Sequence, residues 1–445
     1  MSILDGSVAN TALPTIVREL HTTAADSIWV VNAFNLAVTM SLLTFAALGD
    51  SFGYSRMYTI GLIVFTVASL CCALSPTLPI LVASRALQGI GSAAIMATGP
   101  AIYRQIFPHR QLGRALGLSG VIVATSSAAG PTIGGSILAV AAWPWIFAVN
   151  VPVGIFAVLF SRRALPREPG TGNRLDPASV ALSAFALGGS IFAIDGFARQ
   201  TPIAIILAEG TVGALCAVLF IRRSLRIDRP LIAVDLFAKG TFSLATLTAL
   251  CTYIAQGLAY VSLPFYFQSV LGSTAFGSGL LLTSWPLAVA CIAPIAGRLS
   301  DRYPAGVLST IGLAIFAVGL AMFASMPAHP SVVAILVNGA VCGIGFGFFQ
   351  SPNNRSLLGA APRMQSGSAV GVLATVRLTG QTLGAAVVSI VFASIAVSLV
   401  HGTSIEFTVR SATPIVLWIA CASAVTGALL SGLRLGVRQV AAPQG

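Results

Sequence analysis

The chain has 445 residues, of which 8% are charged and 56% apolar, and its mean hydropathy is +0.92. An average soluble domain is about 25% charged. The composition therefore excludes a disordered chain, a collagen-like fibre and a disulfide scaffold. It also argues against a soluble enzyme, because too few polar side chains are present to cover a water-facing surface. A lipid bilayer is the solvent that such a chain predicts.

Fourteen apolar stretches approach the roughly 20 residues that a membrane-spanning helix requires. We therefore expect an all-α membrane protein with fourteen transmembrane helices. In chain order the predicted spans are 1–18, 27–48, 57–75, 78–103, 112–139, 145–161, 177–197, 202–221, 241–267, 275–297, 304–326, 331–350, 366–394 and 413–433.

The placement of basic residues predicts the orientation. The chain has 24 Lys and Arg against 12 Asp and Glu. With the N-terminus in the cytoplasm, nineteen basic residues fall in inside loops or the tail, and three (Arg18, Arg199 and Arg410) fall outside. Arg85 and Arg377 remain at membrane depth. This asymmetry follows the positive-inside rule. It predicts a membrane protein with both termini cytoplasmic, whose net charge of +12 marks topology rather than a nucleic-acid partner. The Arg and Ala bias of the composition suggests a bacterial source, and therefore the inner membrane.

An internal repeat divides the chain. Residues 108–117 recur as 362–371 with five of ten positions identical, and the same offset of 254 relates Gly89-Ile90-Gly91 to Gly343-Ile344-Gly345. A span with its loop averages about 32 residues, so this offset corresponds to about eight spans. We therefore expect a six-helix bundle at 1–165, linkers with two inserted helices at 166–235, and a second six-helix bundle at 236–445.

Sequence motifs resemble those of a known family. Residues 4–14 are similar to L-D-x-T-V-x-N-x-A-L-P, 85–91 to R-x-x-Q-G-x-G, and 143–154 to W-R-W-I-F-x-I-N-V-P-I-G. These are motifs of the fourteen-helix drug:proton antiporters of the major facilitator superfamily, and the resemblance runs from residue 3 to about 385. It implies the major facilitator fold and transport by alternating access of two halves. Family members carry a further half-helix before the first motif, so either the first span is short here or the chain starts upstream.

Asp5 and Arg85 are the candidate proton-coupling residues. An ionisable side chain within a span is costly and marks a functional site. Burial disfavours the charged carboxylate, so Asp5 is a candidate to take up and release a proton. A guanidinium keeps its proton, so Arg85 would act as a fixed charge that stabilises the carboxylate. Alternatively, Asp5 lies at the inner interface and Arg85 extends its charged group to the membrane surface.

Two further motifs of the family describe how the halves move. Residues 46–56 and 297–302 resemble the loop G-x-L-a-D-R-x-G-R-R, which implies a conformational latch or, alternatively, a solvated turn. Residues 117–135 resemble the antiporter motif, whose glycines let helices approach closely and whose proline bends the helix. The alternative is ordinary packing of small residues. The implied latch residues are Asp50, Gly53, Arg56, Asp301 and Arg302, and the implied hinge residues are Gly117, Gly130, Pro131, Gly134 and Gly135.

A substrate cavity between the halves should be mostly apolar and aromatic with few polar anchors. Each candidate lining residue could equally be packed between helices. The candidates are Asn10, Asn32, Asn35, Gln88, Tyr253, Gln256, Tyr260, Gln268, Phe346, Gln350, Arg377 and Gln381.

The predicted function is proton-coupled export of small amphipathic or cationic drugs by a monomer in contact with membrane lipid. The seven cysteines show no metal-ligand spacing, the four histidines lie in loops, and no nucleotide-binding loop is present, so we expect neither a cofactor nor an enzyme. A dedicated metabolite exporter, or an importer, on the same fold is the alternative. A membrane-embedded enzyme would need clustered His, Asp and Glu at membrane depth.

Overall fold

The computed structural model describes residues 1–108, 122, 125–126, 129–166, 176–198, 201–227, 234–300, 302–327, 329–360, 366–398 and 405–434. Within these ranges the chain forms helices and no strand.

The helices form two series along the chain: the first ends at residue 224, and the second begins at residue 234. The first series is α1 (Ser2–Glu19), α2 (Ala24–Ser27), α3 (Trp29–Phe52), α4 (Tyr54–Ala73), α5 (Leu78–Ile106), Ala129–Val140, α7 (Trp145–Ala148), α8 (Asn150–Ala164), α9 (Pro177–Ala198) and α10 (Ile203–Ser224). The second is η1 (Val234–Ala238), α11 (Gly240–Phe265), η2 (Tyr266–Val270), α12 (Ala275–Leu299), α13 (Ala305–Ala324), α14 (Val332–Ala360), α15 (Ser366–Ser398) and α16 (Ile405–Leu433).

Twelve helices in the described part are long and apolar enough to cross a membrane. The sequence predicted fourteen spans. α1 is an 18-residue helix outside the twelve, because polar residues such as Asp5, Asn10 and Arg18 lower its hydropathy. Ala129–Val140 is shorter than a span, and most of the remainder of the predicted span 112–139 lies outside the described residues.

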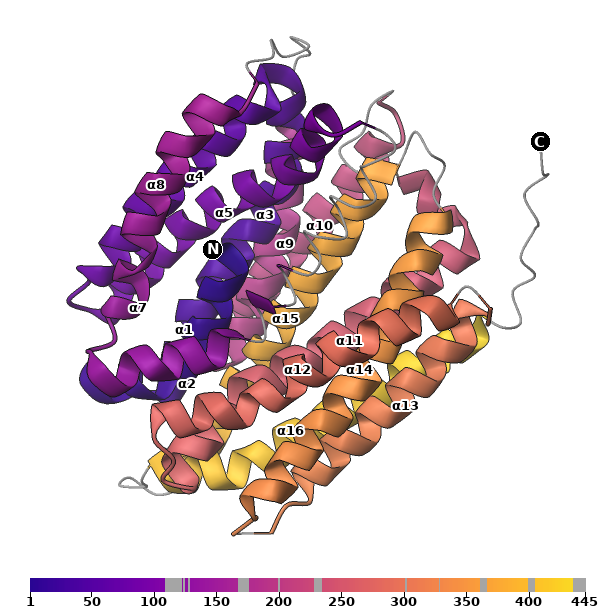
Figure 1. Cartoon of the computed structure of the whole chain (residues 1–445). Coiled ribbons are helices and arrows are strands. Elements are labelled where there is room, and N and C mark those ends of the chain that lie inside the picture. Colours follow the sequence, from indigo (N-terminus) through magenta and orange to yellow (C-terminus); the bar gives the residue numbers. More distant parts are fainter. Residues whose placement is uncertain are drawn as a thin grey trace.

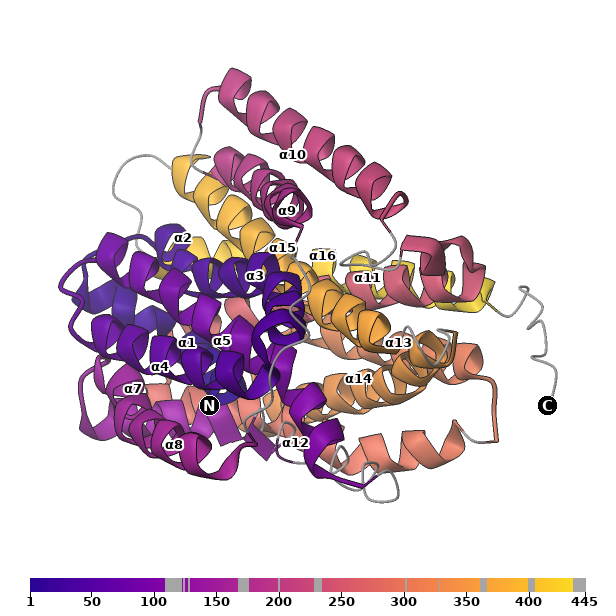
Figure 2. The ribbon, with the colours of Figure 1, turned by 90° about the horizontal axis from the view of Figure 1, so that it is seen from above.

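The helices form two groups with one pair at the edge. Figure 1 shows α1 to α8 in indigo and magenta beside α11 to α14 and α16 in salmon to yellow. α15 packs against α11 and α16 of the second group and also against α3 and α9. α9 and α10 pack on each other, and Figure 2 shows α10 outermost.

Equivalent helix pairs pack in the same way in the two groups. A Cβ on Gly91 of α5 would lie 2.5 Å from the backbone nitrogen of Phe65 on α4. A Cβ on Gly345 of α14 would lie 2.3 Å from the backbone nitrogen of Phe316 on α13. Both approaches require glycine because the backbones touch. Gly91 and Gly345 are 254 residues apart, so the sequence repeat corresponds to a repeated helix packing.

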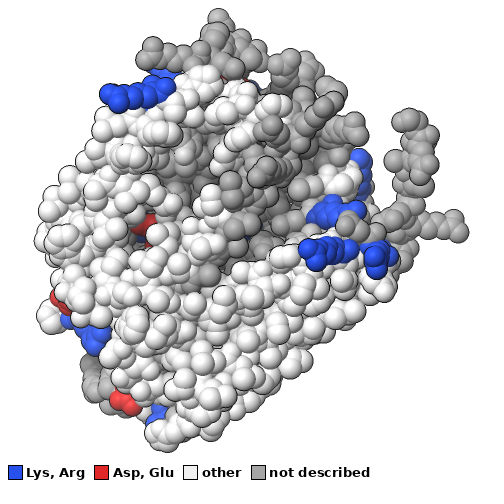
Figure 3. All heavy atoms as spheres, in the orientation of Figure 1, with Lys and Arg blue, Asp and Glu red and all other residues white. Residues whose placement is uncertain are grey.

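Few charges lie on the sides of the molecule. Figure 3 shows Lys and Arg mainly toward the ends of the helices, with a largely uncharged surface between them. One exposed pair joins the ends of α9 and α10: Arg223 donates Nε and Nη2 hydrogen bonds of 2.7 and 2.8 Å to Asp176. The Arg223 guanidinium holds the pKa of Asp176 well below its usual range. Exposed pairs of this kind add little to stability.

Candidate functional site

The two predicted proton-coupling residues meet inside the first helix group. Asp5 on α1 forms an ion pair through Oδ2 with Nη1 of Arg85 on α5. Both side chains are completely buried. The guanidinium therefore points into the helix group and not outward from it.

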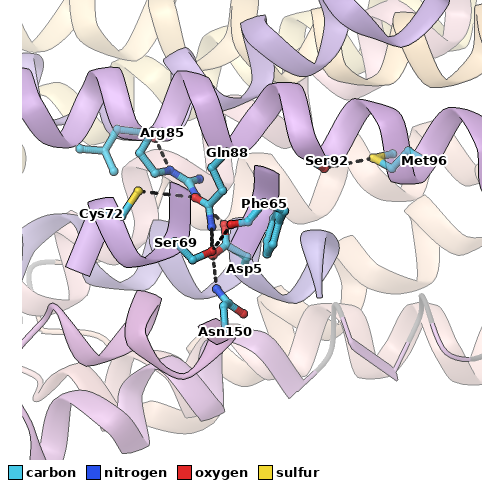
Figure 4. Close-up of polar contacts among 10 residues, drawn as sticks. Asp5, Phe65, Ser69, Cys72, Arg85, Gln88, Ser92, Met96 and Asn150 are labelled. Atoms are coloured by element: carbon cyan, nitrogen blue, oxygen red, sulfur yellow. Dashed lines mark hydrogen bonds and ion pairs between the residues drawn. The ribbon is translucent and has the colours of Figure 1, made fainter. Parts of the chain in front are cut away.

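The second oxygen of Asp5 receives two amide donors. Asn150 Nδ2 on α8 donates a 2.7 Å hydrogen bond to Oδ1, and Gln88 Nε2 on α5 donates one of 3.1 Å. Gln88 also donates to Ser69 Oγ on α4 at 2.8 Å. Figure 4 shows these side chains converging on the carboxyl group from different helices. We call Asp5, Ser69, Arg85, Gln88 and Asn150 the carboxylate network.

Arg85 is held in place on its other sides. Its Nε donates a 2.9 Å hydrogen bond to the backbone oxygen of Val30 on α3. The guanidinium carbon lies 4.3 Å from the ring centroid of Phe34 and 5.4 Å from that of Phe147. Cation–π contacts of this kind are strongest where water is excluded. Arg85 is thus a fixed positive charge rather than a mobile surface group.

Three N–H donors surround the carboxyl group of Asp5. All donors point at the carboxyl oxygens, and hydrogen bonds to a charged acceptor stabilise the charged form. Oδ1 already accepts two N–H donors, so a proton on that oxygen would require Gln88 or Asn150 to move. Protonation would also leave Arg85 buried without a counter-charge, which is costly.

The antiporter-motif residues lie between α1 and the second helix group. Cβ atoms built on Gly130 and Gly134 would lie 2.5 Å from Ser7 Cβ and 3.0 Å from a Val8 methyl group on α1. A Cβ on Gly135 would lie 2.6 Å from the backbone oxygen of Ala275 on α12. One face of this segment thus contacts the helix that carries Asp5, and another contacts α12. Gly117 lies outside the described residues.

Pro131 takes part in the closest contact with the second group. A Cβ on Gly279 of α12 would lie 2.1 Å from the Pro131 backbone oxygen. The hydroxyls of Thr132, the residue after Pro131, and Thr283, one turn after Gly279, are 2.6 Å apart. Helix Ala129–Val140 and α12 are therefore in direct backbone contact here.

Other bonds between the groups lie at the same end of the molecule. Gln268 Nε2 in η2 donates to the Thr11 backbone oxygen of α1 at 2.9 Å, and Ser389 Oγ of α15 donates to the Ala25 oxygen at 3.2 Å. A pocket of about 370 Å³ lies beside them, lined by α1, α11, η2 and α16. We call this end, marked by Gln268, the Gln268 end.

Substituting a contact glycine should open the Gln268 end. We expect Gly279→Ala to force α12 away from Pro131, at an overpacking cost of about 1–3 kcal/mol. Such a cost shifts a two-state equilibrium by about five- to 150-fold. Electron–electron distance measurements between spin labels at Glu19 and Ser273 should show a larger population of long distances. Gly432→Ala is the control, because a Cβ there meets nothing within 4 Å. Identical distance distributions in both variants would contradict this prediction.

The predicted latch residues occupy helix ends. Asp50 lies in the last turn of α3 rather than in a loop, and it accepts a hydrogen bond from the Tyr54 hydroxyl. Gly53 joins α3 to α4 with a φ of 95°, which only glycine adopts easily. Arg56 in the first turn of α4 and Arg302 before α13 are exposed. Asp301 lies outside the described residues.

The predicted cavity residues fall into two sets. Asn10, Asn35, Tyr260, Gln350, Arg377 and Gln381 are half-buried, whereas Asn32, Gln88, Tyr253, Gln256, Gln268 and Phe346 are buried. Gln88 belongs to the carboxylate network. Gln268 bonds to α1 and also lines the 370 Å³ pocket.

The second helix group contributes a core of aromatic rings. The ring of Tyr253 on α11 lies 5.9 Å from that of Phe346 on α14 and 6.4 Å from that of Phe349. Tyr260 lies 4.9 Å from Trp285 on α12. Gln381 Nε2 on α15 donates to Gln256 Oε1 at 3.1 Å. Tyr253, Gln256, Phe346 and Gln381 are therefore packed between α11, α14 and α15.

Comparison with known proteins identifies the family. The model of the Major Facilitator Superfamily matches residues 1–385 and, in a second match, 245–441. The chain belongs to the major facilitator superfamily. It resembles the solved structure of a POT family transporter in complex with a thioalcohol-conjugated peptide, with a TM-score of 0.71 and 14% identity, covering 98% of this chain and 95% of that one.

Three curated members of the superfamily are similar over most of their length. The uncharacterized transporter YebQ of Escherichia coli is 46% identical, covering 98% of this chain and 93% of YebQ. The riboflavin transporter RibZ of Clostridioides difficile is 33% identical (88% and 86%). The multidrug resistance protein Stp of Mycobacterium tuberculosis is 31% identical (88% and 74%).

Sequence reasoning missed two members of the carboxylate network in this major facilitator protein. Asn150 lies in a motif that had no assigned role, and Ser69 lies in none. One feature of the sequence could have identified Asn150: it is an amide side chain within an apolar stretch, five residues after Trp145. Ser69 had none, because small hydroxyl residues are common in membrane helices, where they bond to their own backbone, as Ser69 also does with Phe65.

Proposed function

We propose that this chain is a proton-coupled exporter of small amphipathic compounds. The carboxylate network is the observation that carries the proposal. A buried carboxyl group with a fixed positive partner and movable amide donors can exchange a proton only with rearrangement of the helices. The resemblance of the antiporter motif and the similarity to the multidrug resistance protein Stp support the direction of transport.

In the proposed cycle, Asp5 accepts a proton from outside when the halves open outward, and the substrate leaves. The neutral carboxyl group releases its amide donors, and the halves close toward the outside. When the halves open inward, the proton leaves under the influence of Arg85, and substrate binds. A pH difference of one unit supplies roughly 1.4 kcal/mol per proton. A potential of about 100 mV adds roughly 2.3 kcal/mol per charge.

The proposed architecture has fourteen spans, with bundles at 1–165 and 236–445 and two inserted helices in the segment 166–235. The positions of α1 and Ala129–Val140 between longer helices support counting both as spans. The edge position of α9 and α10 supports their assignment as an insertion. We propose that both termini are cytoplasmic, that the membrane is the bacterial inner membrane, and that one chain is sufficient for transport, because the carboxylate network lies within one helix group.

With this orientation, contact between the groups at the Gln268 end corresponds to an inward-facing state. The contacts of the Gln268 end, including those of Gly135 with Ala275 and of Gln268 with Thr11, would then lie on the extracellular side. Closure on that side is the state in which Asp5 would release its proton. The ion pair of Asp5 with Arg85 and its amide donors support that assignment.

A single lysine allows a direct test of orientation. Lys239 is the only lysine of the chain, is exposed and lies between α10 and α11. We expect a membrane-impermeant amine reagent to modify Lys239 in everted membrane vesicles and not in right-side-out vesicles, as measured by peptide mass spectrometry. Lys239→Arg is the control for reaction elsewhere. Modification in right-side-out vesicles would overturn the proposed orientation.

A dedicated metabolite transporter on the same fold is the second candidate. The similarity to the riboflavin transporter RibZ, 33% identical, favours it. Such a protein would move one compound and confer no resistance to toxic compounds, whereas a drug exporter would lower the accumulation of several.

Transport in everted vesicles tests the proposed function. An inside-acidic pH gradient should drive uptake of a fluorescent amphipathic dye, and a protonophore should abolish that uptake. Counterflow of dye without a gradient reports the folded transporter independently of coupling. Dye counterflow that a pH gradient leaves unaffected would overturn proton coupling.

A further inference from the structure

Arg377 is a second charge at membrane depth. It lies on α15 within the apolar stretch Gly371–Ile395. Three residues along, a Cβ on Gly380 would lie 2.7 Å from Tyr253 Cβ on α11. Tyr253 is 13 residues from Gly240, where α11 begins, or about 20 Å along the helix. Arg377 therefore lies within one helical turn of the middle of α11 and not at a helix end.

The surroundings of Arg377 are polar on one side. Gly380, three residues along α15, packs against Tyr253 of α11, and the Tyr253 ring packs against Phe346 of α14. Gln381, one turn along the same face of α15, donates a hydrogen bond to Gln256 on α11. Arg377, Gln350 and Gln381 are all half-buried, so part of each polar side chain is accessible.

The charge of Arg377 has no counter-charge in the described part of the chain. Asp5 is already paired with Arg85. Glu209 lies on α10, which packs on α9 and away from α11 and α14. No described carboxylate lies within ion-pair distance of Arg377. An unpaired guanidinium at membrane depth is costly, and such charges usually have a partner or line a substrate pathway.

We propose that Arg377 binds an acidic group of the substrate, so that the transported compounds are small amphipathic carboxylates. The guanidinium fork matches a carboxylate with two parallel hydrogen bonds. The rings of Tyr253, Phe346 and Phe349 are buried against one another and keep this part of α11 and α14 in place. This inference rests on the proposed function and narrows its substrate class, because a cationic drug would be repelled here.

The direction of transport fits this substrate class. An anion that leaves the cell moves toward the positive side of an inside-negative membrane, so the membrane potential favours its export. Exchange for an incoming proton adds a second charge movement in the same electrical direction. An importer of the same anion would work against the potential.

Equilibrium binding to the purified full-length chain in detergent tests the inference without transport. The probes are 2-naphthoate and 2-naphthamide, which differ only in that the carboxylate of the first is a neutral amide in the second. Binding of each probe is measured by equilibrium dialysis. We expect the natural chain to bind the carboxylate at least tenfold more tightly than the amide. Arg377→Gln should weaken naphthoate binding at least tenfold and leave naphthamide binding unchanged. Arg377→Lys should retain part of the preference, because it keeps the charge and loses the fork.

Exposed Arg223→Gln is the matched control and should keep the full preference. Equal affinity for the two probes, no binding of either, or an equal loss of both in Arg377→Gln would overturn the inference. Failure of the anion site and failure of proton coupling give different results. If carboxylate binding depends on Arg377 but a pH gradient does not drive naphthoate transport, the anion site is retained and proton coupling is overturned. If a pH gradient drives transport of naphthamide and naphthoate at equal rates, proton coupling is retained and the anion site is overturned.

Discussion

Replacing Asp5 with Asn is expected to abolish proton-driven accumulation while preserving passive exchange. Asn has the shape of the carboxyl group and can still accept a hydrogen bond, but it cannot exchange a proton. Under a pH difference of one unit, coupling to one proton supports at most about tenfold accumulation, since one pH unit corresponds to roughly 1.4 kcal/mol. In everted vesicles we expect the natural chain to approach that ratio and Asp5→Asn to fall to about one.

Glu209→Gln provides the matched control for this experiment. Glu209 is also an acidic side chain within a spanning helix, but it is on α10 at the edge of the molecule. The variant Glu209→Gln should therefore keep the full accumulation ratio. Counterflow measured without a gradient shows that each variant is folded. Gradient-driven accumulation that persists in Asp5→Asn would show that the coupling proton binds elsewhere.

The second large effect concerns stability. Arg85→Met should lower the free energy of unfolding by about 3–5 kcal/mol, because it leaves the Asp5 carboxylate buried without its charged partner. Asp5→Asn leaves the Arg85 guanidinium buried without its charged partner and should also lower the free energy of unfolding. The double variant Asp5→Asn with Arg85→Met removes both charges. It should be more stable than the sum of the single effects predicts, and the difference measures the coupling.

Unfolding by titration with dodecyl sulfate in mixed micelles measures these differences. Arg223→Met is the control, because its pair with Asp176 is exposed and contributes little. If the effects of the two single substitutions simply add in the double variant, the ion pair of this structure does not contribute to stability.

The predicted pair of Asp5 and Arg85 was available from the sequence because charge is scarce. Only a few ionisable residues fall within apolar stretches, so each one required a partner. The contact itself lies between residues 80 positions apart, and helix periodicity does not determine which faces meet. Gln88 was noticed as a polar residue of α5 but assigned to the substrate cavity, because its direction depends on how α5 packs on α4 and α1.

For the antiporter motif too, the sequence predicted part of the arrangement and the packing decided the rest. The glycine spacing predicted close helix contacts at 130–135. That Gly130 faces Ser7 and Gly135 faces Ala275 follows from the packing of three helices. The structure therefore joins the helix of Asp5, the antiporter motif and α12 into one continuous set of contacts.

The sequence by itself determined the all-helical membrane class, the superfamily and the presence of a charged pair. These follow from composition, from apolar lengths and from local motifs, which depend on residues close together in the chain. Only the tertiary structure decided which donors surround Asp5, which helix ends of the two groups are in contact, and that no carboxylate in the described part pairs with Arg377. Those properties depend on helix rotation and crossing. In a chain where nearly every helix face is apolar, the hydrophobic pattern cannot specify which face points toward the interior.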